Sequence, residues 1–282
     1  INYRDKLNQE ITASVAYSFD NVNNDNNQLD FIETLNTLGT IFTLDSNERD
    51  AKSNKHNLNW SLQSVGEKSY FQAGVIGSFL NTNDAFNGNS IQSGVIRQDQ
   101  RNISNTTAFV PDFNMNVAWA YRFKKPGRNL SLGLTAKNGI SDVTEDISSR
   151  IGYYEADRSR IVKDSILNRL VDTRNKSRHI ETSIRFSEPV GNRADSLVSR
   201  NLDIYYNFQF EKNDNNLLTQ VTNNRFNKRV VDSLSTIYTS KFFSHLVGLS
   251  YRFGSEDLSY SLGITAQPNL LMVENEQPRS TV

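Results

Sequence analysis

The three histidines of the chain, His56, His179 and His245, are its most obvious candidates for metal binding or general base catalysis. None lies at the i, i+2 or i, i+4 spacing from another that would place two imidazoles on one metal ion. Each falls near the end of a predicted strand, next to a polar segment. The sequence therefore predicts polar residues at strand ends, with no metal site and no cofactor.

A hydrolase would need a serine, a histidine and a carboxylate that act together. Ser244 and His245 are adjacent in the sequence, so in a strand their side chains point to opposite faces and cannot be nucleophile and base to each other. His56 and His179 have no serine in a recognisable nucleophile elbow. We therefore expect that the chain is not an enzyme.

Two acidic segments could supply oxygen ligands for calcium. Residues 21–30 contain several Asn and Asp side chains, and Asp142, Glu145 and Asp146 form a second group. The first segment lacks the central glycine and the bidentate glutamate of a calcium loop. Solvated loops are the favoured interpretation of both, and calcium binding by a loop is left open.

Composition excludes several classes of protein. The 282 residues include 31 Lys and Arg and 31 Asp and Glu, so no basic excess indicates nucleic-acid binding. There is no cysteine, which excludes disulfides and thiolate chemistry. No run of about 20 apolar residues is present that would predict a membrane-spanning helix. Phe and Tyr are abundant, at 16 and 11, which favours β-structure.

Strict alternation of apolar and polar residues is the strongest pattern. In residues 201–211, Leu202, Ile204, Tyr206, Phe208 and Phe210 share one face of a predicted strand. The same pattern predicts nine strands, centred on residues 11–19, 58–62, 71–79, 115–123, 130–136, 180–186, 201–211, 247–253 and 258–266. Residues 160–171 also show some helical periodicity, with an extended strand as the alternative.

Short and long connections alternate along the chain. Short ones with turn residues are expected at 65–69, 124–128, 188–200 and 254–257. Long ones rich in Asn, Asp and Ser are expected at about 20–55, 81–112, 138–178 and 212–241, with their outer parts continuing the strands. Short turns thus recur about every 60 residues, whereas a soluble β-sandwich would have turns every 8–12 residues or so.

Internal repetition supports a hairpin module. Residues 121–123 (Tyr-Arg-Phe), 184–186 (Ile-Arg-Phe) and 251–253 (Tyr-Arg-Phe) each end a predicted strand at a short connection. Residues 132–136 (Leu-Gly-Leu-Thr-Ala) are echoed at 262–266 (Leu-Gly-Ile-Thr-Ala). A single hairpin module has been reused.

These patterns predict an all-β fold, an antiparallel up-and-down transmembrane β-barrel of outer-membrane type, with a soluble β-sheet as the competing interpretation. The polar positions predicted to face the lumen are Asn116, Arg122, Arg185, Asn207, Gln209, Glu211 and Arg252. The positions predicted to face lipid or to form aromatic girdles are Tyr17, Phe19, Trp119, Tyr121, Phe123, Phe186, Tyr206, Tyr251, Phe253 and Tyr260.

Two regions carry a resemblance to a known family. Residues 1–6 (Ile-Asn-Tyr-Arg-Asp-Lys) precede an alternating strand and an Asn-rich run, and residues 200–253 contain a long alternating strand, Asp232-Ser233-Leu234, and a final strand ending in Tyr251-Arg252-Phe253. These features resemble the Bacteroidetes outer-membrane β-barrel family related to TonB-dependent receptors. The motifs describe strands and turns rather than chemistry.

The resemblance implies a barrel of about 22 strands with a plug domain and a periplasmic energy-transducing partner. Residues 1–282 contain no plug-like region, and nine strands is an odd number, so we expect one domain that is part of a larger barrel, with exposed edges at residues 11–19 and 258–266. The expected function is the outer-membrane portion of a receptor for uptake or binding of a solute in a Gram-negative bacterium. Its expected partners are outer-membrane lipid, the remaining strands and the plug. The alternative is a structural or adhesive surface protein whose long loops bind partners.

Overall fold

The fold is an antiparallel β-sheet. The structure is a computed structural model that describes residues 1–7, 10–155, 157, 160–191, 198–223 and 227–276. The elements in chain order are β1 (Asn2–Lys6), β2 (Ile11–Asn36), β3 (Gly39–Val65), β4 (Ser69–Gly94), β5 (Gln98–Arg122), β6 (Asn129–Tyr154), β7 (Ile161–Pro189), β8 (Ser199–Asn223), β9 (Asn227–Val230), the 3-10 helix η1 (Asp232–Leu234), β10 (Thr236–Gly254), β11 (Ser259–Ala266) and β12 (Asn269–Glu276). Within these ranges no helix has the length and apolar character needed to span a membrane.

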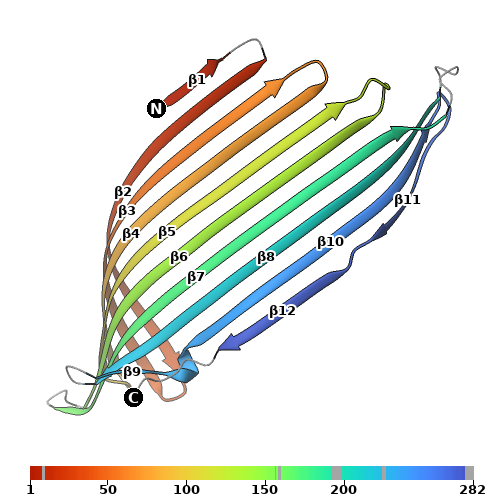
Figure 1. The fold of residues 1–282 in the computed structure, drawn as a ribbon. Coiled ribbons are helices and arrows are strands. Elements are labelled where there is room, and N and C mark those ends of the chain that lie inside the picture. The colour runs from red at the N-terminus through yellow and green to blue at the C-terminus, as the bar shows by residue number, and fades with distance from the viewer. Residues whose placement is uncertain (8–9, 156, 158–159, 192–197, 224–226, 277–282) are drawn as a thin grey trace.

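Each long strand pairs with its neighbours in the sequence, so the chain runs up and down across one layer (Figure 1). The path is β1-β2-β3-β4-β5-β6-β7-β8-β10-β11, with β9 beside β8 and β12 beside β10. The strands β1, β3, β5, β7 and β10 finish at one end of the sheet, along the upper margin and upper right of Figure 1. We call this the short-turn end and the other the hairpin end.

All nine predicted strands are present, and the structure adds three. β1, β9 and β12 were not predicted, so the expected number of nine is wrong. β1 and β9 are only 5 and 4 residues long. Strands this short contain too few alternating positions to stand out from the surrounding polar sequence.

The expected long loops are wrong in extent, because most of their residues belong to strands. β2 and β3 pair without interruption from Ile11↔Ser64 to Asn36↔Gly39, leaving a two-residue turn at 37–38. Gly39 has a φ of 131°, which an L-residue rarely adopts. The expected continuation of the strands is confirmed. Polar residues are tolerated on both faces here because pairing satisfies the backbone while the side chains remain in solvent.

The segment with helical periodicity, residues 160–171, is a strand from Ile161 onward and pairs with β6. The expected short turns at 65–69, 124–128 and 254–257 are confirmed to within a residue or two. In the turn at 188–200, residues 192–197 lie outside the described part of the chain.

The sheet is open in the structure, so the predicted barrel is not closed within these residues. Residues 11–19 were expected to form an exposed edge, and this is wrong for residues 12–16, because β1 covers them from Asn2↔Ala16 to Lys6↔Thr12. The expected edge at 258–266 is confirmed, because within the described residues β11 pairs with β10 on one side and with no strand on the other. β11 and β12 lie one after the other along β10, separated by Gln267 and Pro268.

The strands are staggered relative to one another. One row of directly paired residues contains Tyr70, Ala120, Ser131, Arg185, Tyr205 and Gly248. Tyr70 is one residue from the start of β4, whereas Gly248 is six residues from the end of β10. The stagger is thus five residues over five strand-to-strand steps. Each residue advances about 3.4 Å along its strand, and neighbouring strands are about 4.8 Å apart. The strands are therefore tilted by about 35° from the direction perpendicular to the line that joins the turns.

A single layer leaves this chain with almost no interior. Among the described residues, Ala73 and Pro111 are the buried residues with apolar side chains. The accessible surface is 19287 Å², whereas a compact monomer of 32.1 kDa exposes about 12,000 Å². Both faces of the sheet are therefore open to whatever surrounds the molecule.

Candidate functional site

The register sorts the side chains of the sheet onto two faces. Tyr17 is paired with Leu58, Leu58 with Gly77, and the same row continues through Phe113. Directly paired residues share a face, and successive residues alternate. We call the face that carries Tyr17 the banded face, and the other the opposite face. All ten predicted girdle positions fall on the banded face, and all seven predicted lumen positions fall on the opposite face.

Aromatic side chains line the banded face at the short-turn end. The rings of Trp119 and Tyr121 stack at 6.0 Å between centroids, and Tyr121 meets Phe123 edge-on at 5.0 Å. Phe123 in turn meets Phe186, at 6.2 Å. Tyr251, Phe253 and Tyr260 continue the contacts on the last strands, with Phe253 and Tyr260 stacked at 5.0 Å. We call this row, the one nearer the short turns, the lower girdle; in the view of Figure 1 the short turns are at the top.

A second aromatic row crosses the same face farther from the short turns. Two groups in it have the same construction. The Tyr17 hydroxyl lies 2.7 Å from His56 Nδ1, with the Phe19 ring 4.8 Å from the imidazole. The Tyr206 hydroxyl lies 2.9 Å from His245 Nδ1, with Phe208 at 5.1 Å.

These two Tyr-Phe-His groups are separated by a constant interval. Tyr17 and Tyr206, Phe19 and Phe208, and His56 and His245 are each 189 residues apart (206 − 17, 208 − 19 and 245 − 56). In each group the histidine is directly opposite the phenylalanine across the strand pair. Phe210 and Phe243, at 4.9 Å, and Phe79 and Phe113, at 5.2 Å, extend the row. This row is the upper girdle.

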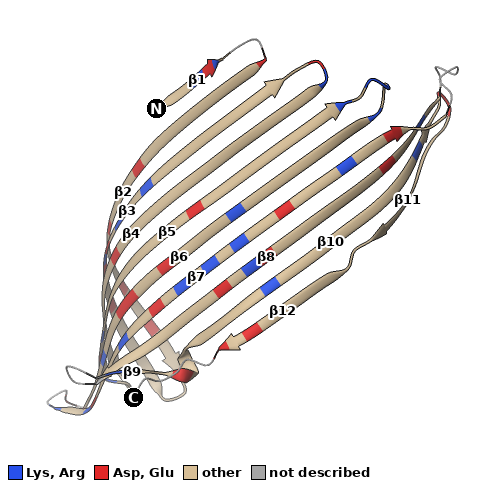
Figure 2. Cartoon of the chain, viewed as in Figure 1, with Lys and Arg blue, Asp and Glu red and all other residues tan. Residues whose placement is uncertain are grey.

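Among the described residues between the girdles, the banded face carries no Asp, Glu, Lys or Arg. Figure 2 colours the charged residues of both faces, which lie at the short turns, along the middle of the strands and toward the hairpin end. On β10 the girdles lie at Phe253 and Phe243, ten residues apart, which is about 34 Å along the strand and about 28 Å along the normal at a tilt of 35°. Apolar side chains between the two girdles are exposed, with Leu249 at 42% and Val247 at 49% exposure.

The opposite face is polar and partly networked. Asp203 is 5% exposed and accepts hydrogen bonds from Ser187 Oγ and, at 2.7 Å, from Arg252 Nε. The Arg185 guanidinium lies 5.8 Å from the centroid of the Tyr205 ring. Gln209 donates a hydrogen bond to Glu211 at 2.8 Å. The predicted lumen positions Arg185, Gln209, Glu211 and Arg252 thus make side-chain contacts on this face. Asp203 was not predicted, although its alternation with Leu202 and Ile204 places it on this face.

The short turn between β5 and β6 is joined to the end of β7 by an ion cluster. Glu188 accepts a hydrogen bond from Arg128 Nε at 2.5 Å and from Lys125 Nζ at 2.7 Å. The hydrogen bond from Arg128, and then that from Lys125, lowers the pKa of Glu188 from about 4.5 to about 2. The cluster lies beyond Phe186, outside the region between the girdles.

The three histidines do not come together. His56 and His245 lie on the banded face in the two groups above, whereas His179 is on the opposite face, where its Nδ1 is 3.1 Å from Glu211. Ser244 and His245 point to opposite faces, as expected from their adjacency, and Ser244 accepts a hydrogen bond from Gln267 at 3.2 Å. Within the described ranges no group of three His, Asp or Glu side chains has metal-binding geometry.

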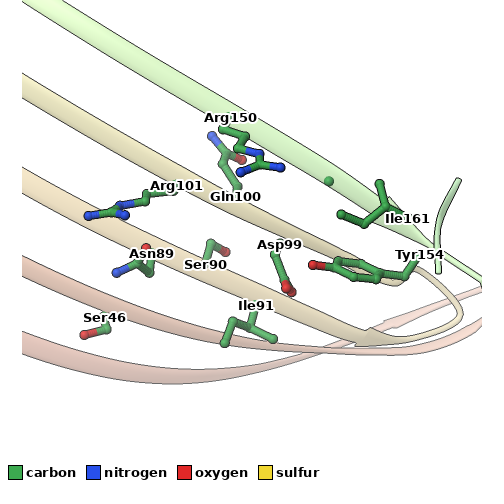
Figure 3. A pocket seen from close by; sticks show the side chains of 11 residues that line it. Ser46, Asn89, Ser90, Ile91, Asp99, Gln100, Arg101, Arg150, Tyr154 and Ile161 are labelled. Carbon is green, nitrogen blue, oxygen red and sulfur yellow. The ribbon is translucent and has the colours of Figure 1, made fainter. Parts of the chain in front are cut away.

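An open hollow of about 620 Å³ lies near the hairpin end (Figure 3). Its lining mixes charges, with Asp99, Arg101 and Arg150 from β5 and β6, and Tyr154 and Ile161 close the side nearest the hairpin tip. Arg150 is already paired with Asp164, at 3.0 Å. None of the residues predicted from the sequence as site residues lines this hollow.

Comparison of the chain with protein-family models, with curated proteins and with solved structures gave no match.

Proposed function

We propose that this chain is the membrane-spanning sheet of an outer-membrane β-barrel protein of a Gram-negative bacterium, in which the banded face meets lipid and the opposite face lines the lumen. The observation that carries the proposal is an uncharged apolar face bounded by two aromatic girdles on a single-layer sheet. Transmembrane β-barrels have this pattern, with an apolar band about 25 Å tall between aromatic girdles and strands tilted by about 35–45°. The girdle separation of about 28 Å and the tilt of about 35° derived above agree with those values.

Backbone chemistry supports a barrel over an open sheet in lipid. An unpaired strand edge in hydrocarbon leaves N–H and C=O groups without partners, at a cost of several kcal/mol each. The outer edges of β1, β2, β11 and β12 have no pairing strand within the described residues. In the proposed protein, further strands or another copy of the sheet complete the cylinder.

The role we assign is uptake or binding of a solute by a receptor related to TonB-dependent receptors, as the sequence resemblance implies. The Ser187–Asp203–Arg252 network, in which Ser187 and Asp203 are buried and Arg252 is exposed, supports it, because it fixes polar groups on the face that a plug or solute would contact. A plug domain and a box for the energy-transducing partner in the full-length protein would favour this role.

A second candidate is a surface protein that binds partners through its hairpins. The observation that favours it is the length of β2 and β3 beyond the upper girdle. From Phe19 to Asn36 is 17 residues, or about 58 Å of extended chain. Deletion of residues 24–51 would abolish partner binding but spare solute uptake if this second function were the principal one.

The proposal is tested by labelling β8 residue by residue in lipid. The chain has no native cysteine, so single cysteines introduced at positions 203–210 can each carry a spin label. We expect contact with lipid-soluble oxygen at Ile204, Tyr206 and Phe208, and contact with a water-soluble relaxation agent at Asp203, Tyr205 and Asn207. A uniform response at all positions would contradict the membrane assignment.

A further inference from the structure

Three cations lie side by side on the banded face immediately beyond the upper girdle. Arg178 in β7 is directly opposite Lys212 in β8, and Lys212 is directly opposite Lys241 in β10. Directly paired side chains have Cβ atoms about 5 Å apart, and like charges in this position destabilise a sheet. Basic bands are present on β7, β8 and β10 in Figure 2.

Acidic neighbours neutralise only part of this charge. Lys212 is 3.1 Å from Asp214, and Lys241 is 3.3 Å from Glu274. Among the described residues, neither Arg178 nor Lys176, the next residue toward the hairpin end on the same face, has a carboxylate within ion-pair distance. Lys176 is directly opposite Asp214, and the charge of Arg178 also acts on Asp214, so this one carboxylate is shared with Lys212. The four basic residues Lys176, Arg178, Lys212 and Lys241, less the two carboxylates, leave two positive charges.

The row next to these cations, on the side of the upper girdle, is apolar. Ile180, Phe210 and Phe243 form the adjacent row on the same face and are directly opposite one another. The two rows are about 7 Å apart along the strands. A molecule in contact with both would therefore need an anionic group at the basic row and a hydrocarbon group at the apolar row.

The equivalent place on the first strands is different. Just beyond the upper girdle there, Asn21, Asn54 and Asn81 form a row of direct partners on the same face. This row is uncharged, and Asn21 donates a hydrogen bond to Asn54 at 2.5 Å. The cations are therefore a local feature of β7, β8 and β10. The position just beyond the upper girdle does not by itself require basic residues, since asparagines occupy it on the first strands.

We infer that the row Arg178–Lys212–Lys241 is a binding site for the phosphate of an anionic membrane lipid, whose acyl chains lie against Ile180, Phe210 and Phe243. Basic side chains at the border of a membrane attract anionic headgroups, and arginine and lysine are the residues that bind phosphate. The inference rests on the proposed function, because it needs the banded face to meet lipid. A bound phosphate would also relieve the repulsion between the opposed cations.

The test compares two charge-matched double variants of the full-length protein in lipid nanodiscs. Arg178→Gln with Lys212→Gln removes two charges from the row. Lys55→Gln with Lys137→Gln removes two from the opposite face, on β3 and β6. Each protein is placed in discs of phosphatidylcholine alone or with phosphatidylglycerol, and bound anionic lipid is measured by native mass spectrometry after transfer to detergent.

We expect the Arg178/Lys212 variant to lose affinity for phosphatidylglycerol by about thirtyfold, the change expected for two basic residues near an anionic surface, with the Lys55/Lys137 control within about twofold of the parent. Inorganic phosphate should compete weakly, since it lacks acyl chains. Equal losses in both variants, or full competition by inorganic phosphate, would overturn the lipid site.

The two proposals fail in different ways. Parent protein that enters the discs but shows no preference for the anionic lipid would refute the binding site and leave the membrane assignment standing. Parent protein that enters neither kind of disc would refute both. Recovery of each variant in discs is measured first, so that a folding defect is distinguished from lost binding.

Discussion

At the scale of single residues, the position of a side chain on one face or the other decides its surroundings. Leu249 and Ser250 are neighbours in β10, yet Leu249 shares its face with Ile204, and Ser250 shares its face with Asp203. In a membrane one of these faces would meet hydrocarbon and the other a polar lumen. The loss of folding stability caused by introducing a charged side chain should therefore differ sharply between adjacent positions.

Leu249 lies between the girdles, four residues from Phe253 and six from Phe243, so Leu249→Arg should destabilise the folded protein by about 2–4 kcal/mol. Asn207→Arg, on the opposite face, should change stability by less than about 1 kcal/mol. The measurement is urea unfolding in lipid vesicles. Phe208→Arg, at the upper girdle, should fall between the two, and equal costs at all three positions would argue against lipid on either face.

The cluster around Glu188 makes a pH-dependent contribution. The folded-state pKa of Glu188 lies near 2, below the ordinary value of about 4.5, so its contribution to stability is complete above pH 4.5 and is lost as the pH falls toward 2. Amide hydrogen exchange at 123–125 and 127–128, measured as protection relative to the intrinsic exchange rate at each pH, should therefore lose protection across this interval. In Glu188→Gln the protection of the same amides should be low and should depend little on pH. Unchanged protection in the parent between pH 5 and 2 would show that the cluster does not hold the turn in place.

At the scale of elements, strands that continue far beyond the upper girdle turn the expected long loops into paired hairpins. Their tips, rather than their flanks, are then the accessible sites. Lys212 is held between Arg178 and Lys241 within paired strands, whereas Arg160 at the tip between β6 and β7 has a side chain that is 76% exposed.

We expect the short turns to face the periplasm and the hairpin tips to face outward, as in other outer-membrane barrels. Trypsin added to intact cells should cleave at Arg160 and spare Lys124 and Lys125. Permeabilised cells serve as the control, since both ends are then accessible. Cleavage at Lys124 or Lys125 in intact cells with Arg160 spared would reverse the orientation.

At the scale of the whole molecule, the decisive fact is that one layer of sheet has nothing packed on either face. Its exposed surface exceeds that of a compact monomer by more than half (19287 against about 12,000 Å²). Apolar surface on this scale needs a cover of lipid, detergent or protein.

Residues 1–282 alone should therefore associate when refolded without detergent, through the banded face and the open edges of β2 and β12. Sedimentation should show oligomers in buffer and a smaller species in detergent micelles. Pro268 interrupts the edge formed by β11 and β12, so Pro268→Val should strengthen association. A monodisperse monomer in plain buffer would contradict the need for a cover.

The sequence by itself determined which residues share a face, because side chains alternate strictly along a strand and this depends on no other part of the chain. Leu202 to Phe210 and the ten girdle positions followed from that rule. It also located most short turns, where Pro126 with Gly127 carries a local signal.

Only the tertiary structure decided which residues lie opposite one another, since register depends on pairing between segments far apart in the chain. That is why the Tyr206–His245 contact, the burial of Asp203 and the row of Arg178, Lys212 and Lys241 were not predicted. The length of the strands was also decided by pairing. The Asn- and Asp-rich parts of β2 and β3 have low intrinsic preference for strand, and their ladder of backbone hydrogen bonds holds them extended as far as Asn36 and Gly39.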